Sequence, residues 1–339
     1  MKRRLRLLTR CPGKSWPTIS AIGIGAMSFS DFYGPTDIKD TFSILNTAME
    51  NGINHIDTAD IYGLGVSENR IGKFLATLGK KDRDFFIIAS KGGIKTSPGT
   101  PPTFDNSEEY LTKQLDRSLK RLGVDNIELY YIHRREEAIP IEEVVETLLK
   151  FKKAGKINQF GFSEISPTSL VKANKMHHVG AIQSEYSLST RYPELGLLQK
   201  TKELETALVA FSPVGRGLLT DTPPTKEKVM TIPFLKTNPR FLEPNLTENV
   251  KAVRGFQELA QDFGIGTAGL AIAWLLAKDD HIIPIPGTRS VNHLKEMIKG
   301  IELNLSGNDM VKIEKTLPVG WAHGDRYSQI QWIGPEKYC

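Results

Sequence analysis

Cysteine is nearly absent from the sequence: only Cys11 and Cys339 occur among 339 residues. This scarcity excludes a disulfide scaffold and is typical of a reducing compartment. No stretch approaches the roughly 20 consecutive apolar residues of a membrane-spanning helix. The first leucines, Leu5, Leu7 and Leu8, are too interrupted by charge to form the apolar part of a secretory signal. We therefore expect a cytoplasmic protein without a membrane segment.

The body of the chain also lacks an excess of either charge. The formal net charge is +5. Six basic residues stand among the first fourteen without any acid: Lys2, Arg3, Arg4, Arg6, Arg10 and Lys14. Without them, 38 basic residues face 39 acidic ones. A nucleic-acid partner is therefore not expected, and we interpret the basic segment as part of a solvated N-terminal hairpin.

Several well-known ligand motifs are incomplete. The glycine-containing segments 23–28, 63–68 and 215–220 do not complete G-x-G-x-x-G. The run Pro12-Gly13-Lys14-Ser15 ends like a phosphate-binding loop, but Leu8 stands where that motif needs its first glycine. His177-His178 has no cysteine or carboxylate at ligand spacing, so we expect no bound metal.

Eight short apolar runs recur along the chain and predict strands. They are Ile19–Ala26, Ile53–Ala59, Phe85–Lys91, Ile127–His133, Ile157–Ser163, Ala181–Glu185, Ala207–Ser212 and His281–Pro286. Several have apolar residues at both odd and even positions, which is typical of strands that are covered on both faces. Helical patterns lie between them, and their alternation predicts parallel βα units.

Four of these helices have readable ends. Ser67 and Gly79 bracket one, and Asn106 with Glu109 resembles a capping box for a helix ending at Gly123. Another runs from Pro140 to Gly155, and Ser166-Pro167 opens a fourth.

The expected fold is a single α/β domain over residues 1–339, a (β/α)8 TIM barrel with an N-terminal hairpin. On pattern alone, a doubly wound parallel sheet is the alternative. The irregular stretch from Gly215 to about Thr247 contains five prolines and follows the seventh run. We expect it to be a long loop over the C-terminal mouth of the barrel.

Four chemically distinct side chains follow successive strands: Asp57 and Tyr62 after the second, Lys91 at the end of the third and His133 at the end of the fourth. Side chains at these strand ends meet at the mouth of a barrel. A protonated lysine beside a phenol lowers its pKa, and a carboxylate keeps the lysine charged. Singly, the lysine could be a salt-bridge partner and the tyrosine a packing residue. Together they suggest a proton donor for carbonyl reduction.

The segment GINHIDTADIYGLGVSENRIGKFL resembles the aldo-keto reductase family, whose motif is Asp-Thr-Ala-x-x-Tyr-Gly. LYYIHRR, AGKINQFGFSE, AIQSEYSL, VAFSPVGRGLLT and PIPGTRSVNHLKEM match it further, in order along nearly the whole chain. GDRY at 324–327 and Asn238-Pro239-Arg240-Phe241 resemble its bacterial-type branch. The resemblance implies an NADPH-dependent barrel reductase of aldehydes and ketones, with NADH also possible.

By this resemblance Tyr62 is the general acid, Lys91 lowers its pKa, Asp57 pairs with Lys91, and His133 orients the substrate. Ser163, Glu164 and Gln183 would face the nicotinamide carboxamide, and Phe211 would stack on its ring. The pyrophosphate would be bordered by Ser212, Val214, Gly215, Arg216 and Gly217. The adenosine end would meet Gly287, Thr288, Arg289, His293 and Glu296.

Two positions depart from the family pattern: His293 replaces a common arginine and Met297 a common asparagine. Loss of the fixed cation at position 293 is expected to reduce the preference for NADPH over NADH. Loss of the asparagine at position 297 is expected to remove a contact with adenine. We expect Met27, Phe29, Tyr33 and Arg134 to line the substrate site, where Arg134 would favour an anionic carbonyl compound or simply form a surface ion pair.

Two other function classes stay open at this point. One is a nucleotide-binding regulatory protein, similar to a channel subunit, with little turnover. The other is a barrel lyase or hydrolase, which needs paired carboxylates or a metal cluster. The physiological substrate, the reaction direction and the oligomeric state are not predicted.

Overall fold

A computed structural model describes residues 9–14, 16–96 and 100–337 of the chain. Eight parallel strands form one sheet in the order β12-β11-β10-β9-β8-β5-β4-β3. Their bounds are Gly23–Gly25 (β3), His55–Asp57 (β4), Ile87–Gly92 (β5), Ile127–Ile132 (β8), Ile157–Ser163 (β9), Ala181–Glu185 (β10), Ala207–Phe211 (β11) and Ile282–Pro284 (β12). The Gly25 N–H donates to the Pro286 carbonyl at 2.9 Å and joins the two edges. The expected barrel is confirmed, and the doubly wound sheet is excluded.

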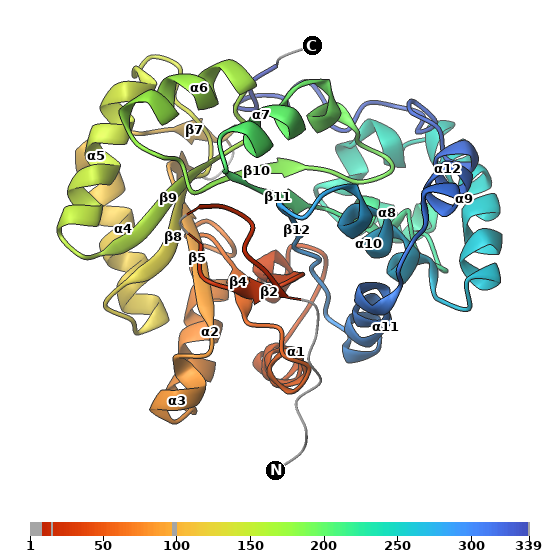
Figure 1. Ribbon diagram of the computed structural model, residues 1–339, viewed down its shortest axis with the longest axis horizontal. Helices are drawn as coiled ribbons and strands as arrows, with labels where there is room; N and C mark the ends of the chain where they lie inside the picture. Colours follow the sequence, from red (N-terminus) through yellow and green to blue (C-terminus); the bar gives the residue numbers. More distant parts are fainter. Residues whose placement is uncertain (1–8, 15, 97–99, 338–339) are drawn as a thin grey trace.

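Helices surround the strands, as Figure 1 shows. They are α1 (Ile38–Glu50), α2 (Val66–Ala76), α3 (Lys80–Arg83), α4 (Glu108–Leu122), α5 (Ile141–Lys153), α6 (Pro167–Met176), α7 (Leu197–Glu203), α8 (Lys226–Met230), α9 (Asn245–Asp262), α10 (Thr267–Lys278), α11 (Val291–Glu302) and α12 (Gly307–Thr316). A two-stranded ribbon, β6 (Ile94–Lys95) with β7 (Thr103–Phe104), precedes α4. No single helix in the described ranges has the length and apolar composition of a membrane span, although α9 and α10, bent by 84°, pass that test as a pair.

Some predicted helix ends are confirmed and some are wrong. Gly123 ends α4 with a φ of 67°, and the Ser166 hydroxyl accepts the Ser169 N–H at the start of α6. The cap of α4 is Ser107 rather than Asn106. Ser67 lies inside α2, where its hydroxyl donates to the Ala26 carbonyl at 2.8 Å. A partner distant in sequence therefore takes the hydroxyl that a helix cap would use.

Gly79 also differs from its prediction. Its φ of −64° and ψ of 159° are extended, and it precedes the short helix α3 instead of ending α2 in a left-handed conformation. α2 ends earlier, at Ala76. Extended backbone is open to any residue, so glycine is not required there by its conformation.

The N-terminal hairpin, β1 (Thr9–Arg10) and β2 (Ile19–Ser20), closes the barrel end opposite the mouth. The Trp16 indole donates to the Gly180 carbonyl at 2.7 Å. Arg10 is buried, and its guanidinium donates to three backbone carbonyls at the C-terminal end of α10 and the start of β12. The expectation of a fully solvated basic segment is therefore wrong for Arg10, while Lys14 is exposed. Lys2, Arg3, Arg4 and Arg6 lie outside the described residues.

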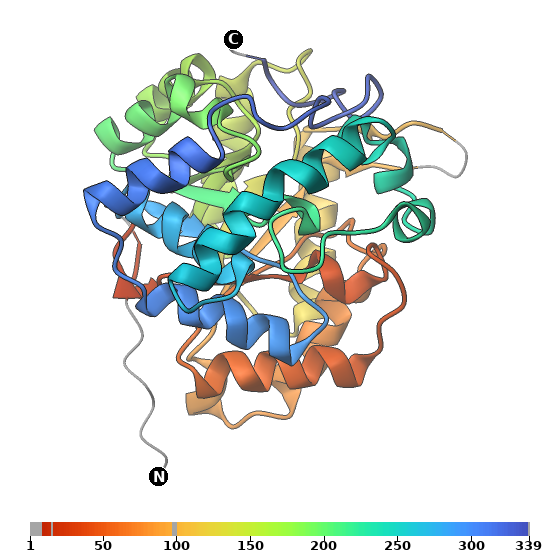
Figure 2. The same ribbon diagram turned by 90° about the vertical axis from the view of Figure 1, so that its right-hand side faces the viewer.

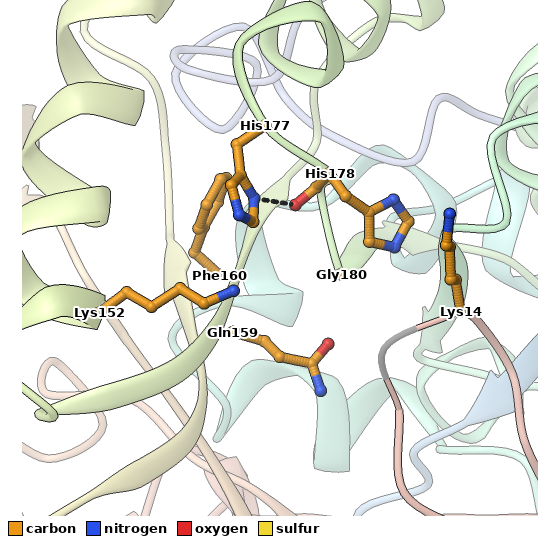
Figure 3. A pocket seen from close by; sticks show the side chains of 7 residues that line it. All are labelled: Lys14, Lys152, Gln159, Phe160, His177, His178 and Gly180. Atoms are coloured by element: carbon orange, nitrogen blue, oxygen red, sulfur yellow. Dashed lines mark hydrogen bonds between the residues drawn. The ribbon is translucent and has the colours of Figure 1, made fainter.

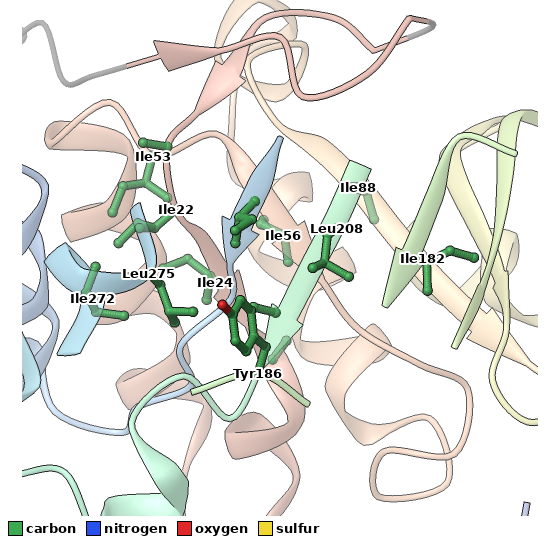
Figure 4. Close-up of a cluster of buried hydrophobic side chains, with 14 of the residues drawn as sticks. Ile22, Ile24, Ile53, Ile56, Ile88, Ile182, Tyr186, Leu208, Ile272 and Leu275 are labelled. Atoms are coloured by element: carbon green, nitrogen blue, oxygen red, sulfur yellow. The ribbon is translucent and has the colours of Figure 1, made fainter. Parts of the chain in front are cut away.

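Two hydrophobic cores hold the barrel together. The inner one contains Trp16, Leu129 and Val209 and fills the barrel above the hairpin. The outer one lies between strands and helices and includes Ile272 and Leu275 of α10 and the strand residue Leu208 (Figure 4). Alternate strand residues contribute to the two cores, which fixes the direction of every strand side chain.

The long loop after β11 folds onto its own small core. It contains η3 (Gly215–Gly217), α8, η4 (Leu235–Thr237) and η5 (Pro239–Phe241). Leu218, Val229, Ile232, Leu235 and Phe241 are buried together within it. In Figure 2 this loop lies on the side of the molecule opposite the hairpin. The predicted irregular stretch is thus a compact covering with short helical turns.

Close packing of α10 on α11 gives a stability prediction. A Cβ at Gly300 of α11 would lie 2.2 Å from the Gly269 carbonyl oxygen of α10. We expect Gly300→Ala to lower the free energy of unfolding by about 1–3 kcal/mol, because the overlap outweighs the better helix propensity of alanine. Urea unfolding measures this change. The matched control is Gly255→Ala in α9, whose nearest atom would be 3.4 Å away and which should be neutral or stabilising. Equal effects of the two changes would contradict the packing argument.

Candidate active site

Lys91, at the end of β5, organises the mouth of the barrel. Its side chain is fully buried, and its ammonium donates to an Asp57 carboxylate oxygen, to the Thr58 carbonyl at 2.8 Å and to the Tyr62 hydroxyl at 3.4 Å. The other Asp57 oxygen accepts a hydrogen bond from the Gln183 amide at 2.8 Å. Residues of β4, β5 and β10 and of the loop after β4 therefore form one connected polar chain.

The electrostatics of this chain keep Lys91 charged. Burial opposes the charged form, but Asp57 and the Tyr62 hydroxyl more than offset it, so the pKa of Lys91 is raised. Burial also raises the pKa of Tyr62, and Lys91 offsets this only in part. The expected net lowering of the tyrosine pKa is therefore not what this arrangement produces. Tyr62 is a protonated phenol beside a fixed cation.

His133 follows β8 and faces the same phenol. The rings of His133 and Tyr62 meet edge-on, with centroids 5.7 Å apart. Burial, with the positive charges of Lys91 and Arg134, holds the pKa of His133 well below its usual value. Its Nδ1 is buried and has no partner in the described ranges. A neutral imidazole at this place can offer a hydrogen bond without adding charge.

Arg134 points to the mouth and touches two of the predicted residues. Its guanidinium donates to the His133 carbonyl at 2.7 Å and to the Ser163 hydroxyl at 3.0 Å. In the part of the chain that the structure describes it makes no ion pair. The alternative of a surface ion pair is therefore not observed, and a half-buried positive charge stands beside the tyrosine.

Glu164, directly after β9, is held by three hydrogen-bond donors. Its carboxylate accepts hydrogen bonds from the Arg326 guanidinium, the Ser184 hydroxyl at 3.1 Å and the Glu185 N–H at 2.8 Å. Burial acts against the charge, yet Arg326 lowers the pKa of Glu164 below its usual value. The side chain therefore binds the C-terminal tail through Arg326.

The Arg216 side chain forms a buried ion pair. Its guanidinium is 4% exposed and donates to the Glu185 carboxylate at 2.6 Å. It lies over the rings of Phe234 and Tyr327, at 5.0 and 5.1 Å from their centroids. The charge of Arg216 is thus neutralised by Glu185 inside the protein.

The other residues of this loop stay close to the mouth. Phe211 ends β11, and Ser212 follows it with a φ of 51°. Phe211, Ser212, Val214 and Gly217 are half-buried, while Gly215 is buried. The positive φ values of Ser212, Gly215, Arg216 and Gly217 bend the backbone tightly around the strand end.

The start of α11 has the character of an anion-binding site. Ser290 caps this helix, the Thr288 hydroxyl accepts the Ser290 N–H, and Gly287 is exposed. Arg289 donates to the Pro35 carbonyl at 3.0 Å and makes no ion pair with any other described residue. An unneutralised guanidinium beside a helix N-terminus suits a phosphate group, so these residues fit a phosphorylated nucleotide.

The two departures from the family pattern have different surroundings. His293 is exposed in the first turn of α11. Met297 is 3% exposed and packs in the outer core, so it makes no surface for adenine. Glu296 accepts the Ala268 N–H at 3.1 Å and thereby caps α10.

The residues that were expected to line the substrate site differ in their burial. Met27 and Tyr33 are half-buried in the segment after β3. Tyr33 adjoins the long loop, and burial raises its pKa to about 12. Phe29, by contrast, is 1% exposed and belongs to the outer core. We therefore correct the expectation that Phe29 lines the mouth.

Sequence reasoning gave no role to Arg326 and Glu185. Arg326, from the C-terminal tail, contacts Glu164 and Glu185 and lies over the rings of Tyr192, Tyr327 and Trp332. The GDRY segment was the available signal, but its partners lie far away along the chain. Among the described residues, no group of three or more histidine, cysteine or acidic side chains could hold a metal ion.

Comparison with known proteins identifies the family of the chain. Residues 21–318 match the model of the Aldo/keto reductase family. The chain is 34% identical over 314 residues to the aldo-keto reductase yakc [NADP(+)] of Schizosaccharomyces pombe, covering 91% of this chain and 92% of that protein. It is 35% identical over 310 residues to the probable aldo-keto reductase 1 of Glycine max, covering 91% and 88%.

Among solved structures, the glycerol dehydrogenase AKR11B4 of Gluconobacter oxydans superposes with a TM-score of 0.79 at 25% identity, covering 91% of this chain and 94% of that one. The family resemblance seen in the motifs is thereby confirmed. The chain belongs to the aldo/keto reductase family, and its sequence and fold are those of an NAD(P)-dependent reductase.

Proposed function

We propose that the protein reduces aldehydes or ketones to alcohols with NADPH, and that Tyr62 supplies the proton. The observation that carries this proposal is the buried chain from Gln183 through Asp57 and Lys91 to the Tyr62 hydroxyl. The name of the yeast relative specifies NADP(+), which supports the choice of coenzyme. Bound NADPH would supply hydride, chemistry that no side chain provides.

Each residue of the chain has a separate task in this proposal. Tyr62 donates its proton to the carbonyl oxygen as negative charge develops there. Lys91 stabilises the phenolate that remains, and Asp57 keeps Lys91 charged and in place. His133, neutral and buried, donates a hydrogen bond that orients the carbonyl oxygen. Gln183 holds Asp57 in position through its side-chain amide. In this proposal Gln183 therefore has a structural role, and the expected contact with the carboxamide is not assigned to it.

We propose that the coenzyme lies along Ser163, Phe211, Ser212, Val214, Gly215 and Gly217 and ends at Gly287, Thr288, Arg289, His293 and Glu296. The tight backbone after β11 and the unneutralised Arg289 support this path. Arg134 adds a positive charge at the mouth, which favours carbonyl compounds that carry an acidic group. The GDRY segment supports a bacterial-type grouping, although the similar proteins come from a yeast, a plant and a bacterium.

The test is the loss of NADPH absorbance with benzaldehyde and 4-carboxybenzaldehyde, each with NADPH and with NADH. We expect turnover with NADPH and a higher kcat/KM for the carboxylated aldehyde. Tight nucleotide binding without turnover on a broad aldehyde and ketone panel would contradict the reductase and favour a nucleotide-binding regulatory protein.

A coenzyme prediction follows from His293. An arginine there adds a permanent charge at the exposed first turn of α11. We expect His293→Arg to lower the Kd for NADPH about 3- to 10-fold, in the range of one charge-assisted hydrogen bond, and to leave the Kd for NADH nearly unchanged. Fluorescence titration measures both constants. Gln261→Arg, which adds the same charge at an exposed position of α9, is the control. Equal gains for the two coenzymes would refute the assignment of His293 to the phosphate end.

A further inference from the structure

A cavity of about 310 Å³ lies at the barrel end opposite the mouth. Lys14 of the hairpin, Lys152 in the last turn of α5 and His177 and His178 after α6 line it, together with Gln159 and Phe160 of β9 (Figure 3). These β9 residues stand early in the strand, whereas Ser163 at its end reaches the mouth. The cavity, here named the basal pocket, is therefore separate from the proposed catalytic and coenzyme sites.

The basal pocket is lined by basic groups and by no carboxylate. Neither Lys14 nor Lys152 forms an ion pair with a described residue. Two acids lie nearby but outside the lining. The Glu128 carboxylate accepts a hydrogen bond from the Gln159 amide at 3.0 Å, and Glu205, whose backbone carbonyl accepts the Lys14 N–H, acts electrostatically on His178. Two ammonium groups without acidic partners create a positive potential in a concave site, where anions concentrate.

His178 adds a directional group to this charge. Burial, with the adjacent His177 and Lys14, lowers the pKa of His178 although Glu205 acts in the opposite direction, and the lowered pKa favours the neutral ring. Its Nε2 atom is buried and has no partner in the described part of the chain. That nitrogen is free to carry the proton and to donate it to a bound oxygen. His177 is held differently: its Nδ1 bonds the His178 carbonyl at 2.9 Å, and its ring packs on Phe160 as a wall of the cavity.

We propose that the basal pocket binds a small phosphorylated metabolite, with the phosphate group between Lys14 and Lys152 and a hydrogen bond from His178. A phosphate dianion matches two ammonium groups in charge and accepts several hydrogen bonds. The volume, at the lower end of small-ligand sites, suits a compact phosphate monoester. The two lysines carry their charge on flexible stems from the hairpin and from α5, so both can adjust to one oxygen cluster.

The probe is inorganic phosphate. Its binding is monitored by NMR through the imidazole signals of histidine-labelled protein. The protein is saturated with NADP⁺ so that the coenzyme site takes up no phosphate, and ionic strength is held constant with chloride. The buffer contains no carboxylate or phosphate compound, so chloride is the only other small anion in the titration. We expect saturable shifts of the His178 resonance, identified with His178→Gln.

Two lysine variants and a matched control decide the result. Lys14→Met and Lys152→Met should each raise the Kd for phosphate at least about 5-fold, as expected for the loss of one charge-assisted contact. Lys153→Met is the control, because Lys153 is exposed in the same last turn of α5 and does not line the pocket. Shifts that do not saturate, or an equal effect of Lys153→Met, would overturn the proposal.

A second titration separates a metabolite from the bare ion. Glycerol 3-phosphate should bind more tightly than inorganic phosphate, because its carbon skeleton occupies the remaining volume beside His177 and Phe160. Binding of inorganic phosphate without binding of glycerol 3-phosphate would overturn the proposal that the ligand is a phosphorylated metabolite. These measurements read out binding at the hairpin end, so their failure leaves the reductase assay unaffected.

Discussion

Tyr62→Phe should reduce kcat/KM for aldehyde reduction by about 10²- to 10⁴-fold, the usual contribution of a general acid. Phenylalanine keeps the ring contact with His133 but has no proton to donate, and Lys91 is left beside an apolar edge. Because the hydroxyl is proposed to act only on the carbonyl oxygen, NADPH binding should survive. Steady-state kinetics and a fluorescence titration with NADPH measure the two effects.

The matched control is Tyr110→Phe. Tyr110 donates its hydroxyl to the Ile94 carbonyl at 3.0 Å, in the ribbon that precedes α4, and has no contact with Lys91. This variant should keep near-normal turnover. If Tyr62→Phe retained more than about a tenth of the activity, well above what loss of a general acid permits, the acid assignment would be wrong. Loss of NADPH binding in Tyr62→Phe would contradict it as well.

Arg326→Met should lower the free energy of unfolding by about 3–5 kcal/mol, as removal of one partner from a buried ion pair does. The guanidinium is 5% exposed, and it holds the Glu164 and Glu185 carboxylates, which are 2% and 0% exposed. Without it, Glu164 has only the Ser184 hydroxyl and the Glu185 N–H as donors. Urea unfolding at neutral pH measures the loss.

An exposed pair provides the comparison. Lys150 and Glu108 lie 2.6 Å apart but are 61% and 51% exposed, so Lys150→Met should cost at most about 1 kcal/mol. The cost of Arg326→Met is attributed to a stranded charge, so adding Glu164→Gln should restore part of the stability. A single variant no worse than Lys150→Met, or a double variant no better than Arg326→Met, would contradict this account of the tail.

The sequence and the tertiary structure each determine part of the site. The sequence predicts Asp57, Tyr62, Lys91 and His133 as site residues because each lies near the C-terminal end of a short apolar run, and parallel strands bring these ends to one edge. The strands β9 and β10 have the predicted bounds, and each of the eight runs includes residues of one barrel strand. Strand positions are readable because covering on both faces demands apolar residues locally.

The first run shows the limit of that reading. Ile19–Ala26 was expected as one strand, yet β2 belongs to the hairpin and β3 to the barrel. The apolar pattern reports burial, and both segments are buried. It does not report which neighbour supplies the hydrogen bonds, and that neighbour differs for the two segments.

The sequence by itself therefore determined the barrel, its hairpin and the identity of the polar side chains at the strand ends. Tertiary structure alone decided what those side chains bind. Glu164 is held by Arg326, 162 positions away, and Arg10 donates to a carbonyl 272 positions away. A buried charge must find a partner wherever the fold places one, because leaving it unpaired costs several kcal/mol. A local sequence pattern can show that a charged residue will need a partner. Only the tertiary structure determines which residue that partner is.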